Sequence, residues 1–237
     1  MKKTISVSNS KATLDTNRRN FLKLSGVGLA IAGLALVGCN DDDMIIDPGT
    51  NVFDLGMGDV GVLNYAYALE QLEADFYTKV VNNFYSGISN DEKTVLTDLY
   101  NHEVIHRDFF KAAITGAAPN SILPTLEFQY PGVNFSNRAS VLATAKALED
   151  TGVAAYNGAG KYITNADYLV LAGKIVSVEA RHASAIRDLI NPKSADFSGD
   201  DVVNAMNGLD VAKEPKDIVA VAGGFIKTPF TWKERGI

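Results

Sequence analysis

The residues best suited to chemistry form two Glu-x-x-His pairs, Glu103 with His106 and Glu179 with His182. A spacing of three places both side chains of a pair on one face of a helix. That face is otherwise apolar, because its other members at steps of three and four are Leu, Ile, Phe, Tyr or Ala. A carboxylate and an imidazole in such a face cost on the order of several kcal/mol unless they are paired or bind a metal. The two pairs therefore predict a buried polar centre, while His102 lies one position off this face and is expected at the surface.

Two further glutamates belong to an internal repeat. Glu70 follows Ala-Leu and is followed seven residues later by Tyr77, and Glu149 follows Ala-Leu and is followed seven residues later by Tyr156. Each half of the repeat is thus one helix with Glu and Tyr and a second helix with Glu-x-x-His. The repeat predicts that four glutamates and two histidines meet at one level of a helical core.

The elements that must position these residues are four helices, which makes the chain all-α. We expect an antiparallel bundle with one long crossover between the second and third helices, over the Pro-rich residues 116–137. Asn90-Asp91-Glu92 resembles a helix N-cap region. The expected helices cover about 58–86, 91–114, 139–162 and a segment that starts at Asn165 to Asp167 and ends before Pro192.

The bundle, residues 58–190, is followed by a C-terminal extension, residues 191–237, without a convincing site. Ser198, Asp200 and Asp201 predict the start of one short helix, and residues 215–222 a second. We expect this small helical extension to pack on one end of the bundle.

The N-terminal segment, residues 1–38, resembles a twin-arginine lipoprotein signal peptide. Arg18-Arg19 is followed by an uncharged stretch that ends in the lipobox-like Leu36-Val37-Gly38-Cys39. Cys39, the only cysteine, would be lipidated and attach the chain to a membrane, and residues 39–57 would form an acidic tether. A weak transmembrane anchor with an incidental arginine pair is the alternative. The predicted location is the cell envelope, periplasmic or at the outer surface.

The charge of the chain argues against nucleic-acid binding. Removal of residues 1–38 takes away six Lys/Arg and one Asp, and the remaining 16 basic and 27 acidic residues give a net charge of −11. A nucleic-acid site needs a basic patch.

Four carboxylates at one level of a core repel one another, and two divalent cations would neutralise them. Oxygen-rich ligation with one imidazole per ion suits Fe or Mn. The expected cofactor is therefore a pair of Fe or Mn ions.

Residues 58–190 resemble the ferritin-like superfamily, and Glu149-Asp150-Thr151-Gly152-Val153-Ala154-Ala155-Tyr156 resembles its exported, desiccation-related bacterial branch. The resemblance implies that Glu70 and Glu149 are terminal ligands and that Glu103 and Glu179 bridge two ions. His106 and His182 would complete one ion each.

Three neighbouring positions have two interpretations each. Glu73 lies on the same face as Glu70, opposite Gly152 in the second half, and is either an additional ligand or an outer-shell carboxylate. Tyr77 and Tyr156 either tune the reaction through a hydrogen bond to a bridging glutamate or are ordinary core aromatics.

Two functions compete. The first is a di-iron or di-manganese oxidoreductase that acts on Fe(II), peroxide or O₂. The second is a metal-holding envelope protein that serves stress or desiccation tolerance without turnover. A lipid anchor argues against a closed ferritin shell, and the sequence leaves smaller oligomers open.

Overall fold

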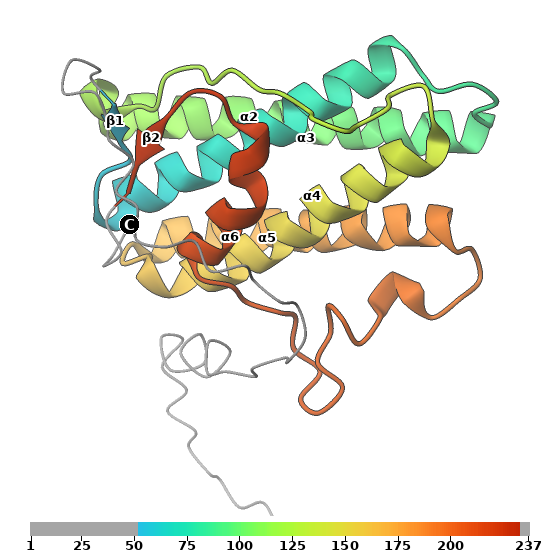
Figure 1. The fold of residues 1–237 in the computed structure, drawn as a ribbon. Helices are drawn as coiled ribbons and strands as arrows, with labels where there is room; N and C mark the ends of the chain where they lie inside the picture. The colour runs from blue at the N-terminus through green and yellow to red at the C-terminus, as the bar shows by residue number, and fades with distance from the viewer. Residues whose placement is uncertain (1–51, 233–237) are drawn as a thin grey trace, which may run out of the picture.

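Four long antiparallel helices form the body of the molecule in the computed structural model, which describes residues 52–232 (Figure 1). Their sides face a common core that contains Leu72, Phe76, Leu142 and Ile186 as fully buried side chains. This arrangement confirms the predicted all-α bundle. The helices are α2 (Gly58–Asn82), α3 (Asn90–Ala117), α4 (Arg138–Ala159) and α5 (Ala166–Ile190).

Polar side chains set the start of three of these helices. Ser89 caps α3, where its hydroxyl accepts from the Glu92 backbone N–H and the Glu92 carboxylate accepts from the Ser89 N–H. The cap therefore lies one residue before the predicted Asn90-Asp91-Glu92. Asn137 caps α4 and Asn165 caps α5 through their side-chain oxygens.

The crossover between α3 and α4 runs along α2 (Figure 1). It contains the short 3-10 helix η1 (Pro119–Ser121) and is otherwise extended or turning. The fully buried Asn64 donates to the Ser121 carbonyl and accepts from the Leu123 N–H, and Gln71 accepts from the Leu126 N–H. Because these amides satisfy backbone groups that the crossover leaves without partners, a long segment lies ordered on the bundle.

The C-terminal segment differs from the prediction in two ways. Ser198, Asp200 and Asp201 do not open an α-helix, because the Asp201 carboxylate pairs with Arg187 instead of capping one. Part of the segment also runs along the side of α4, where the Lys213 N–H donates to the Ala154 carbonyl, which the expectation of packing on one end of the bundle did not include. Its elements are η3 (Asp196–Ser198), α6 (Pro215–Ala222), η4 (Gly223–Phe225) and β2 (Phe230–Thr231).

A short parallel strand pair joins the two ends of the described chain. β1 (Phe53–Asp54) pairs with β2, and the Leu55 N–H donates to the Thr231 carbonyl at 2.8 Å. Leu55 is fully buried. The described part of the predicted tether is thus packed against the bundle.

None of the helices between residues 52 and 232 has both the length and the apolar character that a membrane crossing requires. Arg18, Arg19, Cys39 and the first part of the predicted tether lie outside the described residues.

Candidate metal centre

The four helices bring the predicted polar side chains to one level of the core. Glu70 comes from α2, Glu149 from α4, and α3 and α5 each supply one Glu-x-x-His pair. The four glutamates are completely buried, and His106 and His182 are 9% and 3% exposed. These carboxylate oxygens and imidazole nitrogens form two groups, each compact enough to surround one ion.

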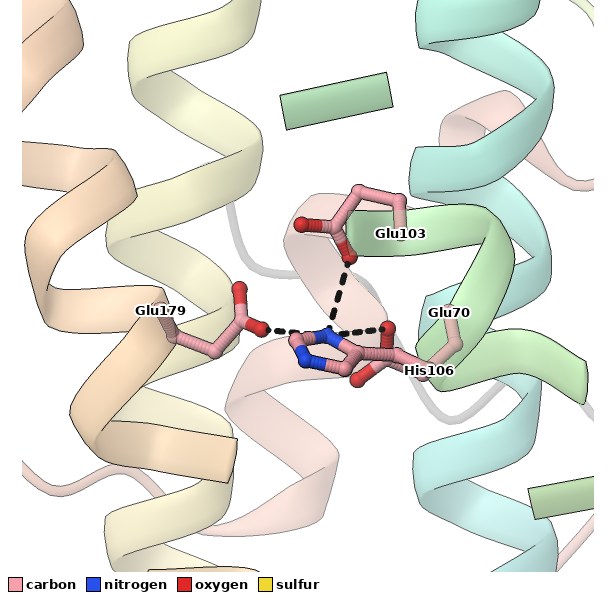
Figure 2. Close-up of side chains that lie close together, drawn as sticks. All are labelled: Glu70, Glu103, His106 and Glu179. Carbon is pink, nitrogen blue, oxygen red and sulfur yellow. Dashed lines mark ion pairs between the residues drawn. The ribbon is translucent and has the colours of Figure 1, made fainter. Parts of the chain in front are cut away.

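The first group surrounds His106 (Figure 2). The His106 Nδ1 atom lies 3.0 Å from Glu179 Oε1, 3.5 Å from Glu70 Oε2 and 3.5 Å from Glu103 Oε2. The helices α2, α3 and α5 therefore contribute to this group.

The second group surrounds His182. The His182 Nδ1 atom lies 2.7 Å from Glu103 Oε1, 3.4 Å from Glu149 Oε2 and 3.7 Å from Glu179 Oε2. Glu103 and Glu179 belong to both groups, and each directs one oxygen toward each histidine. This is the arrangement that two bridging carboxylates require.

The inward atoms of these side chains lack hydrogen-bond partners within residues 52–232. They are both oxygens of Glu103 and of Glu179, the Oε2 atoms of Glu70 and Glu149, and the Nδ1 atoms of the two histidines. Their approaches are close but not aligned as hydrogen bonds. Buried polar atoms normally have a hydrogen-bond partner. The eight atoms named here have none and point toward one another, which fits cations as their missing partners. The donor set of oxygens with one imidazole per group suits Fe or Mn.

Protons would balance the charge of these side chains when no cation is bound. Burial disfavours the charged imidazole, but the carboxylates of Glu103, Glu179 and Glu70 raise the pKa of His106 to about 12. The pKa of His182 is raised in the same way by its three carboxylate neighbours. Burial, partly offset by the contact with His182, raises the pKa of Glu149 to about 7. Because ligands bind metal in deprotonated form, cations would replace these protons.

The two tyrosines of the repeat hydrogen-bond across the bundle. The Tyr77 hydroxyl donates to Glu149 Oε1 at 2.5 Å, and the Tyr156 hydroxyl donates to Glu70 Oε1. A bond to one of the glutamates predicted to bridge was one of the two interpretations, but each tyrosine instead binds a glutamate that belongs to one group only, on a helix of the other half. The bond occupies one carboxylate oxygen and leaves the Oε2 atom directed toward a histidine.

Glu73 lies beside the centre and belongs to neither group of ligand atoms. Its Oε1 atom would be 3.1 Å from a Cβ atom on Gly152, so the missing side chain of Gly152 makes room for the Glu73 carboxyl group. Burial and the neighbouring Glu179 carboxylate raise the pKa of Glu73 well above its ordinary value. The surroundings of Glu73 in the metal-free protein therefore favour the neutral carboxylic acid over the carboxylate.

His102 is exposed, as expected, but it also touches the centre, which the sequence interpretation missed. Its Nδ1 atom lies 2.9 Å from the Nε2 atom of His182. The sequence did contain an indication of this contact: His102 lies four residues before His106, and this spacing places both side chains on the same side of the helix.

Two hollows lie close to these side chains, and one of them follows the junction of α3 and α5. A groove lined by Asp98, His102, His106, Arg181 and His182, among others, leads from the surface to the two histidines of the centre. A second pocket of about 50 Å³ lies between all four helices and is almost wholly apolar; its lining includes Tyr156 together with Leu63, Phe110, Ala155, Ala172 and Ile175.

The bundle and its carboxylate–histidine centre define a class of protein, the helical bundles that could hold metal between facing helices. A family model described as the ferritin-like domain matches residues 58–192, more than half of the chain, and the chain therefore belongs to the ferritin-like family. This confirms the resemblance at the level of the superfamily. A comparison with curated proteins gave no match.

Proposed function

We propose that the chain is an exported, lipid-anchored protein that binds two Fe or Mn ions in this centre and reacts with Fe(II), peroxide or O₂. The observation that carries the proposal is the pair of ligand groups that share Glu103 and Glu179. Four carboxylates with four negative charges match two divalent cations. When bound, such ions would supply one-electron chemistry that no side chain of this centre supplies.

The side chains of the chain have separate tasks in this proposal. The two Glu-x-x-His pairs hold the ions, and Tyr77 and Tyr156 orient the non-bridging carboxylates. Glu73 lies beside the centre without belonging to either ligand group, and Gly152 makes room for its carboxyl group. The packed core around these groups excludes bulk water, which strengthens each charge interaction.

The two hollows support small substrates. The groove that reaches His106 and His182 is lined by charged side chains and suits a polar substrate such as Fe(II) or peroxide. The apolar pocket next to Tyr156 suits O₂, because a void without polar partners does not hold water well.

Metal content and oxidation kinetics test the proposal. Protein loaded anaerobically with Fe(II) and desalted should retain two ions per chain, measured by atomic emission. Stopped-flow absorbance should then show oxidation by O₂ or peroxide faster than that of free Fe(II). Two retained ions without fast oxidation, and without peroxide consumption by the Mn form, would favour the non-enzymatic metal-holding function. Retention of no ion would refute the site.

Export is tested separately in cells of the native host. The double substitution Arg18→Lys and Arg19→Lys should trap the precursor inside the cell, and Cys39→Ala should abolish lipid labelling. Normal processing and labelling of both variants would refute the lipoprotein assignment without affecting the metal centre.

A further inference from the structure

The contact between His102 and His182 has the geometry of an in-plane hydrogen bond. The two rings are nearly coplanar, with an angle of 4° between their planes and 5.1 Å between their centroids. With 2.9 Å between the facing nitrogens, the rings meet edge to edge along the line of a ring N–H bond. This alignment distinguishes the contact from two surface rings that happen to lie near each other.

The direction of this hydrogen bond follows from the ligand role of His182. Its Nδ1 atom faces Glu103, Glu149 and Glu179, so an ion bound there needs the Nδ1 lone pair. The ring proton is then on Nε2, and His102 Nδ1 accepts it.

We propose that His102 is a positioning residue that fixes the orientation and tautomer of His182 and thereby strengthens the ion site of the His182 group. The proposal rests on the two-ion function proposed above. Partners of this kind, one step beyond the ligand, hold the ring in place and make it a better donor.

The second half of the repeat has no equivalent residue. His102 directly precedes Glu103, and the residue that directly precedes Glu179 is Val178. The Val178 side chain has no atom that could accept a hydrogen bond from His106, although it lines the same groove. The two ion sites therefore differ in strength, with the His182 site the tighter one.

Stepwise titration of metal-free protein with Mn(II), followed by electron paramagnetic resonance, tests this inference. His102→Leu removes the acceptor and should weaken one of the two binding steps by about 10- to 100-fold while the other step is unchanged. His102→Asn places an amide oxygen near the Nδ1 position and should restore most of that affinity. Val170→Ala, at an exposed position of α5 outside the groove, is the control and should leave both steps unchanged.

The outcomes separate this inference from the function on which it rests. Two tight steps in His102→Leu, or equal weakening of both steps, would overturn the positioning role while the metal site stands. A wild-type chain that binds no Mn(II) or Fe(II) would overturn the proposed function and this inference together. Nitrogen-15 NMR of the His182 ring in the zinc-loaded protein gives a second readout, with a hydrogen-bonded Nε2–H expected in wild type and in the Asn variant, and an Nε2–H without this hydrogen bond in His102→Leu.

Discussion

The α2–α3 half and the α4–α5 half carry the same ligand types at the same helical positions, but they differ at the residues beside them. The residue after Glu70 is Gln71, whose amide binds the crossover through Pro124 and Leu126. The residue after Glu149 is Asp150, which binds Arg187 instead.

Arg187 connects the second half to the C-terminal segment. It is 3% exposed and pairs with both Asp150 and Asp201. One half thus anchors its connecting segment by a neutral amide and the other by a buried guanidinium. The same position of the repeat serves the same purpose with different chemistry.

The residues closest to the centre also differ between the two halves. Glu73 in the first half faces Gly152 in the second, and His102 in the first half matches Val178 in the second. The glutamates and histidines of the centre match between the two halves of the repeat, but the residues around them do not. The comparison teaches that side chains of the same type at matching positions of a repeat can have different surroundings.

The largest effect is expected from loss of a shared carboxylate. Glu103→Ala or Glu179→Ala removes an oxygen from both ligand groups, so affinity for both ions should fall by more than about 100-fold, since loss of an outer partner alone costs about 10- to 100-fold. Metal content after desalting measures this. The exposed Glu127→Ala is the control, and a variant at Glu103 that keeps one tight ion would contradict the shared role.

Removal of the tyrosine hydroxyls should separate the two halves. Tyr77→Phe frees Glu149 and should weaken the site of the His182 group, whereas Tyr156→Phe frees Glu70 and should weaken the site of the His106 group. Each loss should be about 10- to 100-fold. Calorimetric titration of each variant and of the double variant measures the two steps. The expectation fails if both single variants weaken the same step.

Addition of one methyl group tests the inner asymmetry. In Gly152→Ala the new Cβ would lie 3.1 Å from Glu73 Oε1 and 3.6 Å from Glu179 Oε2, so we expect destabilisation by about 1–3 kcal/mol. In Gly173→Ala on α5 the new Cβ meets nothing within 4 Å, and better helix propensity should add up to about 1 kcal/mol. Urea unfolding of the metal-free variants provides the comparison, and equal stability of the two would count against close packing at Gly152.

The smallest expected effect is the pH dependence of the stability that the Asp201–Arg187 contact provides, compared with that of the Gln71 contacts. Hydrogen bonds from Arg187 lower the pKa of Asp201 to about 2, below its ordinary value of 3.8, so this pairing stabilises the fold above about pH 4 and is lost as the pH falls toward 2. The Asp201 side chain is 60% exposed, and solvent screening limits its contribution to less than about 1 kcal/mol.

Unfolding of metal-free Asp201→Asn should therefore differ from wild type at pH 6 and converge with it in acid. Gln71→Ala should show a difference that does not depend on pH, because an amide does not titrate. A constant difference for Asp201→Asn would contradict the charged anchor.

The sequence predicted what depends on helical period. The alternation of three and four along each helix determines which side chains share a face, so the bundle and the convergence of the four glutamates and two histidines followed from local spacing. The crossover followed from the prolines of residues 116–137. Glu103 and Glu179 occupy equivalent positions for this reason, and the structure places their oxygens in both groups.

The contacts that the sequence did not predict depend on how neighbouring helices are rotated and placed. His102 reaches His182 from a different helix, and Tyr77 reaches Glu149 across the bundle. The C-terminal helix expected at Asp201 was wrong because a distant partner, Arg187, competes for the carboxylate. Local spacing can place His102 on the helix surface near His106, but it does not identify the partner on the neighbouring helix.

The pairing of β1 with β2 determines how mechanical load would enter the molecule. A pull on the chain before residue 52 meets first the strand pair, then the Leu55 N–H bond to Thr231 and the Leu55 carbonyl bond to Asn64. These contacts and the burial of Leu55 must break before tension reaches the first turn of α2. If the preceding segment anchors the chain, the strand pair takes up a pulling force at the anchor before that force reaches Glu70 and the centre.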